Sequence, residues 1–250
     1  MEGTYKKTFL DKVIARLDFA AVLPGVEESL PTPVVEIAIK RFPIVEPKGF
    51  TAGKIKITKE GSVSGEEMAT GKVWYYHGKN REKTLCIAPG WMFIVYTKYE
   101  SFEALKTDFL EVVDTLFKCY GQDVVVKRLG LRYINKVHFD EGEPTRWDKY
   151  IDSNLLQIFK VAEDKTKICR AFHNLELNYG DMNLRFQYGM HNPDYPAPIR
   201  SKDFTLDFDA YYQGLQNKDE IENNLLRFHN EIKRFFEKFI TGKLREVMNK

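Results

Sequence analysis

Apolar and polar residues alternate along several segments of this chain, and a period of two is the pattern of a strand with one buried face. The first such segment covers residues 9–20. One of its sides carries Val13, Ala15, Leu17 and Phe19, and the other carries Lys12, Arg16 and Asp18. A strand patterned in this way packs one face on a core and leaves the other to solvent or a partner. The 18 Phe and 13 Tyr among 250 residues also favour a sheet-rich fold.

Capping and turn residues divide the first half of the chain into further elements. A short helix is predicted with Thr32 as its N-cap and Pro33 at its first position. Segment 101–121 has the apolar spacing of a helix, with Ser101 suited to its N-cap and Gly121 to the position just past its end. Strands are predicted between these helices at about 50–59, 71–78, 83–88 and 91–99.

The second half of the chain repeats this order of elements. A long strand is predicted over 123–139 with Gly130 as a bulge, and residues 145–162 read as helical. A long helix is predicted from Lys218 to about Met248. Between them, strands are predicted at about 166–180, 182–191 and 202–212.

The repeated order of strand, helix, several strands and long helix predicts an α+β fold. We expect one structural unit over 1–250, made of two similar halves of about 1–121 and 122–250. The economical arrangement is one curved antiparallel sheet with both long helices on one face. This plan resembles the topology of TATA-binding-protein-like folds and of effector-binding domains of transcription regulators, and a shared topology carries no function by itself.

Charge and cysteine content narrow the classes of protein. The 38 basic and 36 acidic residues give a net charge of +2, which argues against a nucleic-acid-binding protein because such proteins show a clear basic excess. Three cysteines without a CxxC pair disfavour a disulfide framework and lead us to expect a reducing, cytoplasmic location. The N-terminus has no apolar signal core and no window approaches 18 apolar residues, so no membrane span is expected.

Sequence motifs for cofactor, metal or nucleophile chemistry are missing. The chain has no GxGxxG, GxxxxGK[ST] or GxSxG motif, and its five histidines fall in no HExxH context. The sequence therefore predicts no cofactor, no metal site and no catalytic residues.

Strand parity predicts that the face turned away from the helices is polar. Its candidates for binding a ligand or partner are Arg128, Arg132, Arg170, Asn174, Glu176, Arg185, His191 and Asp207. One interpretation is a solvated face stabilised by opposite charges paired across the strands. The other is a recognition surface, because an arginine grips a carboxylate or phosphate with two parallel donors.

Two segments, RLGLRYINKV over 128–137 and LLRFHNEIKRFFEKFITGKLREVM over 225–248, carry a resemblance to a known group of proteins. The chain resembles a sporadically distributed family of uncharacterised bacterial proteins of about this length. The resemblance implies a single full-length module of unknown role, with Arg132, Tyr133 and Asn135 as candidate positions. Strand parity places Tyr133 and Asn135 on the inward side, which counts against Asn135 as a ligand contact on the open face.

Three functions follow as expectations. The first is a non-catalytic binding module whose polar face takes a small polar or anionic ligand or a protein partner. A homodimer is also considered, because the last helix is apolar on more than one side around Phe235, Phe236 and Phe239. The alternative is a hydrolase of a phosphorylated or nucleotide substrate, with acid–base groups from Glu176, Asp207, Asp209 and His191. Nucleic-acid binding is the third class and rests on topology alone.

Overall fold

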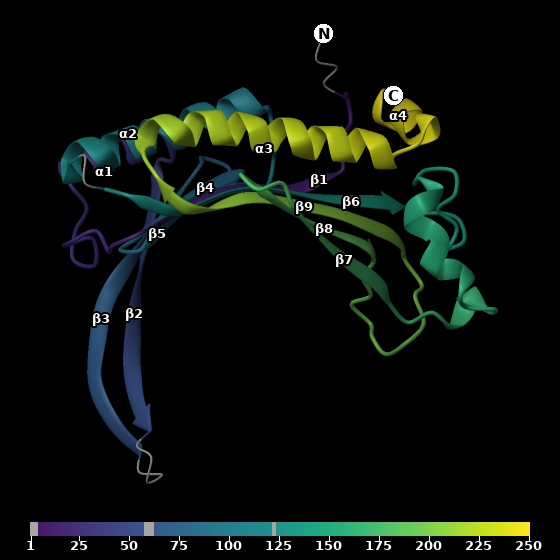
Figure 1. The fold of residues 1–250 in the computed structure, drawn as a ribbon, viewed down its shortest axis with the longest axis horizontal. Coiled ribbons are helices and arrows are strands. Elements are labelled where there is room, and N and C mark those ends of the chain that lie inside the picture. The colour runs from purple at the N-terminus through teal and green to yellow at the C-terminus, as the bar shows by residue number, and fades with distance from the viewer. Residues whose placement is uncertain (1–4, 58–62, 122–123) are drawn as a thin grey trace.

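The computed structural model describes residues 5–57, 63–121 and 124–250. Within these residues nine strands form one open antiparallel sheet, and helices cover one of its faces (Figure 1). The strand order across the sheet is β2-β3-β4-β5-β1-β6-β9-β8-β7. The predicted α+β class and the single antiparallel sheet are therefore confirmed.

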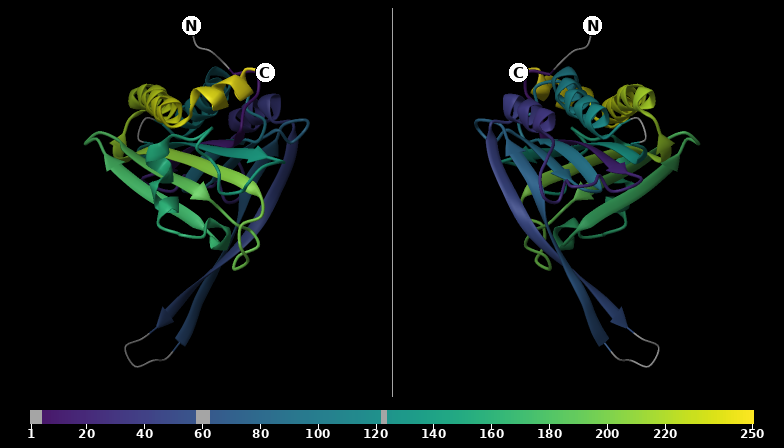
Figure 2. Two further views of the ribbon diagram at one scale, coloured as in Figure 1. Left: turned by 90° about the vertical axis from the view of Figure 1, so that its right-hand side faces the viewer. Right: turned by 90° about the vertical axis from the view of Figure 1, so that its left-hand side faces the viewer.

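The first half of the chain supplies one flank of the sheet and two helices. Its elements are β1 (Leu10–Phe19), α1 (Thr32–Arg41), β2 (Ile44–Ile57), β3 (Val63–His77), β4 (Lys83–Ala88), β5 (Trp91–Tyr96) and α2 (Phe102–Tyr120). Figure 2 shows the β2–β3 hairpin extending away from the helices, beyond the rest of the sheet. Residues 58 and 59 of a predicted strand lie outside the described residues.

The second half supplies the other flank. Its elements are β6 (Val126–Phe139), the 3-10 helices η1 (Ser153–Lys160) and η2 (Lys165–Lys167), β7 (Ala171–Asn178), β8 (Asn183–Met190), β9 (Lys202–Gln216), α3 (Lys218–Phe239) and α4 (Gly242–Met248). The helix prediction over 145–162 holds only for the 3-10 turns from Ser153, and the strand predicted from 166 begins at Ala171. Residue 123, the start of the predicted strand over 123–139, lies outside the described residues.

The two central strands carry the alternation that the sequence predicts. β1 pairs antiparallel with β6, with Ala15 opposite Leu131 and Leu17 opposite Leu129. These four side chains are buried on the face beneath α2 and α3. The core continues across β9 and β8, where the rings of Phe208 and Phe186 stack at 4.5 Å. Apolar burial on this face is the main stabilising contribution to the fold.

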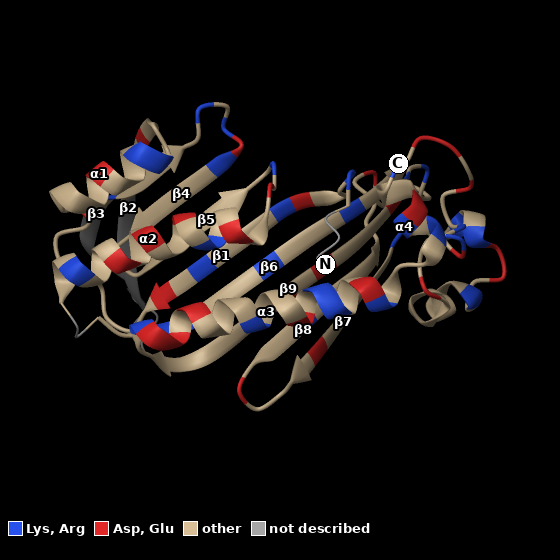
Figure 3. Cartoon of the chain, turned by 90° about the horizontal axis from the view of Figure 1, so that it is seen from above, with Lys and Arg blue, Asp and Glu red and all other residues tan. Residues whose placement is uncertain are grey.

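Local signals set the ends of the long helices. The Ser101 hydroxyl accepts a hydrogen bond from the backbone N–H of Ala104 at 3.1 Å, and Gly121 closes α2 with a φ of +88°, so both predicted caps are confirmed. Helix α3 begins with a capping box between Asn217 and Glu220. The outer sides of the helices carry interspersed charges of both signs (Figure 3).

Three local predictions are wrong. Helix α1 has Pro31 at its N-cap, and Thr32 is already helical without a capping bond. Gly130 is not a bulge: it pairs in register with β1 and β9, and the irregularity in the β6–β9 pairing lies between Val126 and Arg128. The glycine instead leaves room for Arg128, whose Nη1 would lie 3.0 Å from a Cβ at this position.

The third error concerns the last helix, which is broken rather than continuous. Ile240 leaves α3 in an extended conformation and bridges to Ile151, and Thr241 then caps α4 with its hydroxyl. The break turns α4 so that Leu244 and Met248 are buried. Among the described residues no helix is long and apolar enough to cross a membrane.

Candidate functional site on the open sheet face

The face of the sheet opposite the helices is concave and polar, as the parity argument predicts. In Figure 1 the β2–β3 hairpin descends on one side of this face and β7, β8 and the loop after β8 descend on the other. At its centre lies a hollow of about 430 Å³, formed where β5, β1, β6 and β9 run side by side. Its lining residues are Ile14, Arg16, Asp18, Phe93, Val95, Arg128, Gly130, Arg132 and Asp209.

Arg132 and Asp207 form an ion pair beside this hollow. Nε and Nη2 of Arg132 donate to the two carboxylate oxygens of Asp207 at 2.8 and 2.6 Å. The Asp207 side chain is only 8 % exposed, so its buried negative charge depends on Arg132 for stabilisation. The hydrogen bonds that Arg132 donates to Asp207 raise the pKa of Arg132 further. The paired donors that the sequence assigns to a ligand are therefore occupied by the protein itself.

Arg185 and Glu176 form a similar but more exposed pair on β8 and β7. Nε of Arg185 donates to Oε1 of Glu176 at 2.9 Å, and Nδ2 of Asn174 reaches the same oxygen at 3.5 Å. These contacts, with the bond from Arg185 first, lower the pKa of Glu176. Because both partners are well exposed, the pair contributes little to stability and remains accessible at the outer part of the face.

Arg128 and Asp209 are arranged differently. Their closest approach, from Nη2 to Oδ2, is 3.5 Å, and Nη1 of Arg128 lies 3.9 Å from Oδ2 of Asp18. Neither Arg128 nor the Asp209 carboxylate makes a hydrogen bond to any side chain in the described part of the chain. The Arg128 guanidinium lies 5.0 Å from the ring centre of Tyr211. Arg128 and Asp209 are thus ion-paired and face one hollow, without a hydrogen bond between them.

Burial shifts the pKa of Asp209. Desolvation raises the pKa of its carboxyl, and the charges of Arg128 and Arg132 only partly oppose that rise. Burial thus disfavours the charged form of this carboxyl. A partner that donates hydrogen bonds to it is favoured.

The apolar part of the hollow is lined by Ile14, Phe93 and Val95, and Trp91 stacks on Phe93 beside it. Arg16 donates to Asp18 at 3.1 and 2.7 Å and lies 5.1 Å from the ring of Trp91, which stacks on Phe93 at 5.4 Å. Sequence parity assigns Arg16, Asp18 and Asp209 to this face without selecting them as binding candidates. The aromatic residues were missed, although the alternation in WMFIVY over 91–96 places Trp91 and Phe93 on one side.

The structure does not bring all the predicted candidates together. Arg170 precedes β7 and lies 4.5 Å from the ring of Tyr195 in the loop after β8, and His191 is exposed at the start of that loop. Neither lines the central hollow. In the described residues no group of three or more His, Cys, Asp or Glu side chains is placed to hold a metal ion.

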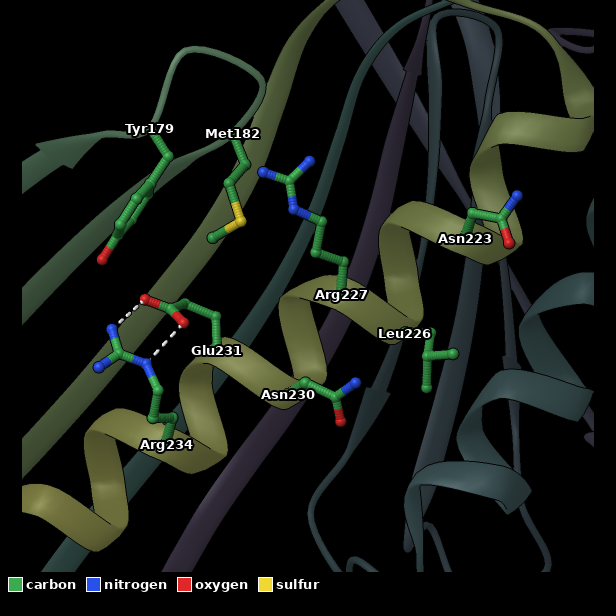
Figure 4. Close-up of a pocket in the computed structure, with 8 residues that line it drawn as sticks. All are labelled: Tyr179, Met182, Asn223, Leu226, Arg227, Asn230, Glu231 and Arg234. Carbon is green, nitrogen blue, oxygen red and sulfur yellow. Dashed lines mark hydrogen bonds and ion pairs between the residues drawn. The ribbon is translucent and has the colours of Figure 1, made fainter.

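A second hollow, of about 460 Å³, lies on the outer flank of α3 beside the β7–β8 turn (Figure 4). Its charged groups are paired within the chain. Arg234 donates to both oxygens of Glu231, and Arg227 pairs with Asp181. Burial, followed by the bond to Glu231, raises the pKa of Tyr179 to about 12. With its charges satisfied, this hollow is a weaker candidate than the centre of the open face.

The sequence matches no protein-family model, and no curated protein is significantly similar to it.

Proposed function

We propose that this protein is a non-catalytic binding module whose open sheet face holds a polar segment of a protein partner. The observation that carries the proposal is the pair Arg128 and Asp209, which face one hollow without hydrogen bonds in the described residues. A peptide group offers both a C=O acceptor and an N–H donor, and so complements a guanidinium and a carboxylate at once. Phe93 in the hollow, with Trp91 stacked on it, adds the flat apolar surface that interfaces favour.

The charge balance of the face supports a peptide rather than a simple anion. Each of the arginines Arg132 and Arg185 is already bonded to a carboxylate, so an added anion competes with a partner that is held in place. An electrically balanced face with an apolar wall suits a mixed polar segment better. Two acid–base groups of the hydrolase alternative, Asp207 and Glu176, are engaged by arginines, and His191 lies away from the hollow. Only Asp209 of that set lines it.

We further propose that the two halves of the chain are related by duplication, on the plan of TATA-binding-protein-like folds. The support is the order of elements about the central β1–β6 pair. On one side β5, β4 and β3 follow β1, and on the other β9, β8 and β7 follow β6. Each half contributes one long helix, α2 or α3, over the same face of the sheet.

The binding proposal is tested with peptides selected against the whole protein from a phage-displayed library. The variants Arg128→Ala and Asp209→Asn are expected to weaken the selected peptides at least tenfold. Lys136→Ala is the matched control, because Lys136 lies on the same strand and face but is paired with Asp11 at 3.1 Å. Peptides that bind all three variants as tightly as the parent protein would refute the proposal.

A further inference from the structure

We propose that a cavity on the opposite side of the sheet, beneath α3, binds a small, flat and neutral molecule that carries one N–H or O–H donor. The cavity has a volume of about 440 Å³, within the range of small-molecule sites. It is bounded by the N-terminal segment, the start of α2, the inward side of β6, one side of α3 and the end of α4. This site does not depend on the function proposed for the open face.

The walls of the cavity are largely apolar. Four elements, β1, α2, α3 and α4, contribute the apolar side chains of Leu10, Phe102, Leu226, Ile232, Phe236 and Met248. The Phe102 ring is stacked on the imidazole of His229, with centroids 4.1 Å apart and planes 9° from parallel. Flat, parallel rings along one wall favour a planar ligand, because aromatic ligands gain from offset stacking.

The floor of the cavity is polar and lies on β6. The Tyr133 hydroxyl is within 2.9 Å of both the Tyr99 hydroxyl and Nδ1 of His229, so three polar side chains form one hydrogen-bonded chain. Beside them, the buried Asn135 donates from Nδ2 to the backbone oxygen of Leu206 at 3.2 Å. That bond fixes the amide so that the Asn135 Oδ1 oxygen is left as an acceptor at the cavity wall.

The chemistry of this floor selects a class of ligand. Oδ1 of Asn135 has no hydrogen-bond partner among the described residues, and a ligand N–H or O–H satisfies it. Burial raises the pKa of Tyr133 well above its usual range, which keeps the phenol neutral. The floor residues Tyr133 and Asn135 carry no charge, whereas the lysines that line the cavity, Lys6 and Lys233, belong to the N-terminal segment and to α3. A ligand group buried against the floor is therefore preferred as a neutral donor rather than a carboxylate.

The alternation along β6 explains why one short stretch of sequence serves two faces. Arg132 belongs to the hollow on the open face, whereas Tyr133 and Asn135 line the cavity beneath α3. Successive side chains of a strand point to opposite faces, so Tyr133 and Asn135 point away from the open face and toward the cavity beneath α3.

The proposal is tested by NMR titration of the intact protein with indole and with N-methylindole, which lacks the donor. Indole is expected to bind saturably, with shifts confined to residues around the cavity. Asn135→Leu is expected to weaken indole roughly fivefold to tenfold, the effect of one hydrogen bond, and to leave N-methylindole unchanged.

A second variant keeps the test decisive if Asn135→Leu fails to fold. Leu226 is half exposed at the cavity, and Leu226→Trp is expected to block the site to both compounds. Leu215→Trp is the matched control, because Leu215 is exposed on β9 and lines no part of the cavity. Absence of saturable indole binding, or equal binding by the two tryptophan variants, would overturn the proposal.

Discussion

Replacing Arg132 by alanine is expected to destabilise the protein by about 2 kcal/mol, because the substitution leaves a buried carboxylate without its partner. Two charge-assisted hydrogen bonds of 2.8 and 2.6 Å are lost, and the Asp207 side chain that remains is only 8 % exposed. The cost lies below the 3–5 kcal/mol typical of a fully buried pair. The Arg132 side chain is 39 % exposed, so water already screens part of the interaction.

Urea unfolding followed by circular dichroism measures this free energy, and the melting temperature is expected to fall by about 4–8 °C. The matched comparison is Arg185→Ala, which removes an exposed arginine from an exposed carboxylate and is expected to cost under about 0.5 kcal/mol. The double variant Arg132→Ala/Asp207→Ala is expected to be more stable than the sum of the single variants predicts, by about 1–2 kcal/mol.

Additive effects in that double variant would refute the reasoning, as would an Arg132→Ala protein as stable as the parent. Either result would mean that Asp207 is compensated by water or by other cations. Arg132 would then be free to act as a ligand-binding group.

Three further predictions concern single residues. Burial raises the pKa of Asp209, so the folded state keeps this proton to higher pH than the unfolded state, and the contribution of Asp209 to stability falls as pH rises from about 4. The melting temperature of Asp209→Asn minus that of the parent should therefore increase between about pH 4 and pH 7. A constant difference would contradict this. Asn217→Ala removes the capping box of α3 and should cost about 1 kcal/mol in urea unfolding, whereas Asn223→Ala, on the exposed side of the same helix, should cost much less. Iodoacetamide should alkylate the exposed Cys119 in the folded protein but spare Cys86, a buried thiol whose pKa is raised to about 12. Mass spectrometry detects the alkylated residues. Alkylation of Cys86 in the folded protein would contradict the burial of this thiol.

Much of the fold follows from local patterns in the sequence. The alternation over residues 9–20 identifies β1 and its buried face, and Ser101 and Gly121 mark the ends of α2. These signals work because they depend on a few neighbouring residues and on one backbone geometry. The break at Ile240 is different, because it depends on Ile151, a residue far away in the sequence that no helical periodicity can reveal.

The candidate site shows the same division between local and distant information. Parity assigns Arg128, Arg132 and Asp207 to the correct face. It cannot say which of the arginines is engaged, because that depends on where each side chain reaches. Arg132 pairs in register with Asp209 but donates to Asp207, which lies diagonally across the two strands. Nη2 of Arg132 lies 2.6 Å from Oδ2 of Asp207, whereas Nη2 of Arg128, whose guanidinium lies over Gly130, is 3.5 Å from Oδ2 of Asp209.

The cavity beneath α3 lies beyond what strand and helix patterns predict. Its walls come from the N-terminal segment, α2, β6, α3 and α4, which meet only in the folded chain. Tyr133 and Asn135 read as ordinary inward residues of a strand until the position of His229 on α3 is known.

The central claim, that the open sheet face is the binding surface, is tested most directly by mapping a selected peptide on the protein with backbone amide NMR shifts. The largest shifts are expected to cluster at Asp18, Gly130 and Asp209, around the hollow between β1, β6 and β9. Shifts that cluster instead on the outer sides of α2 and α3, with the open face unchanged, would contradict it.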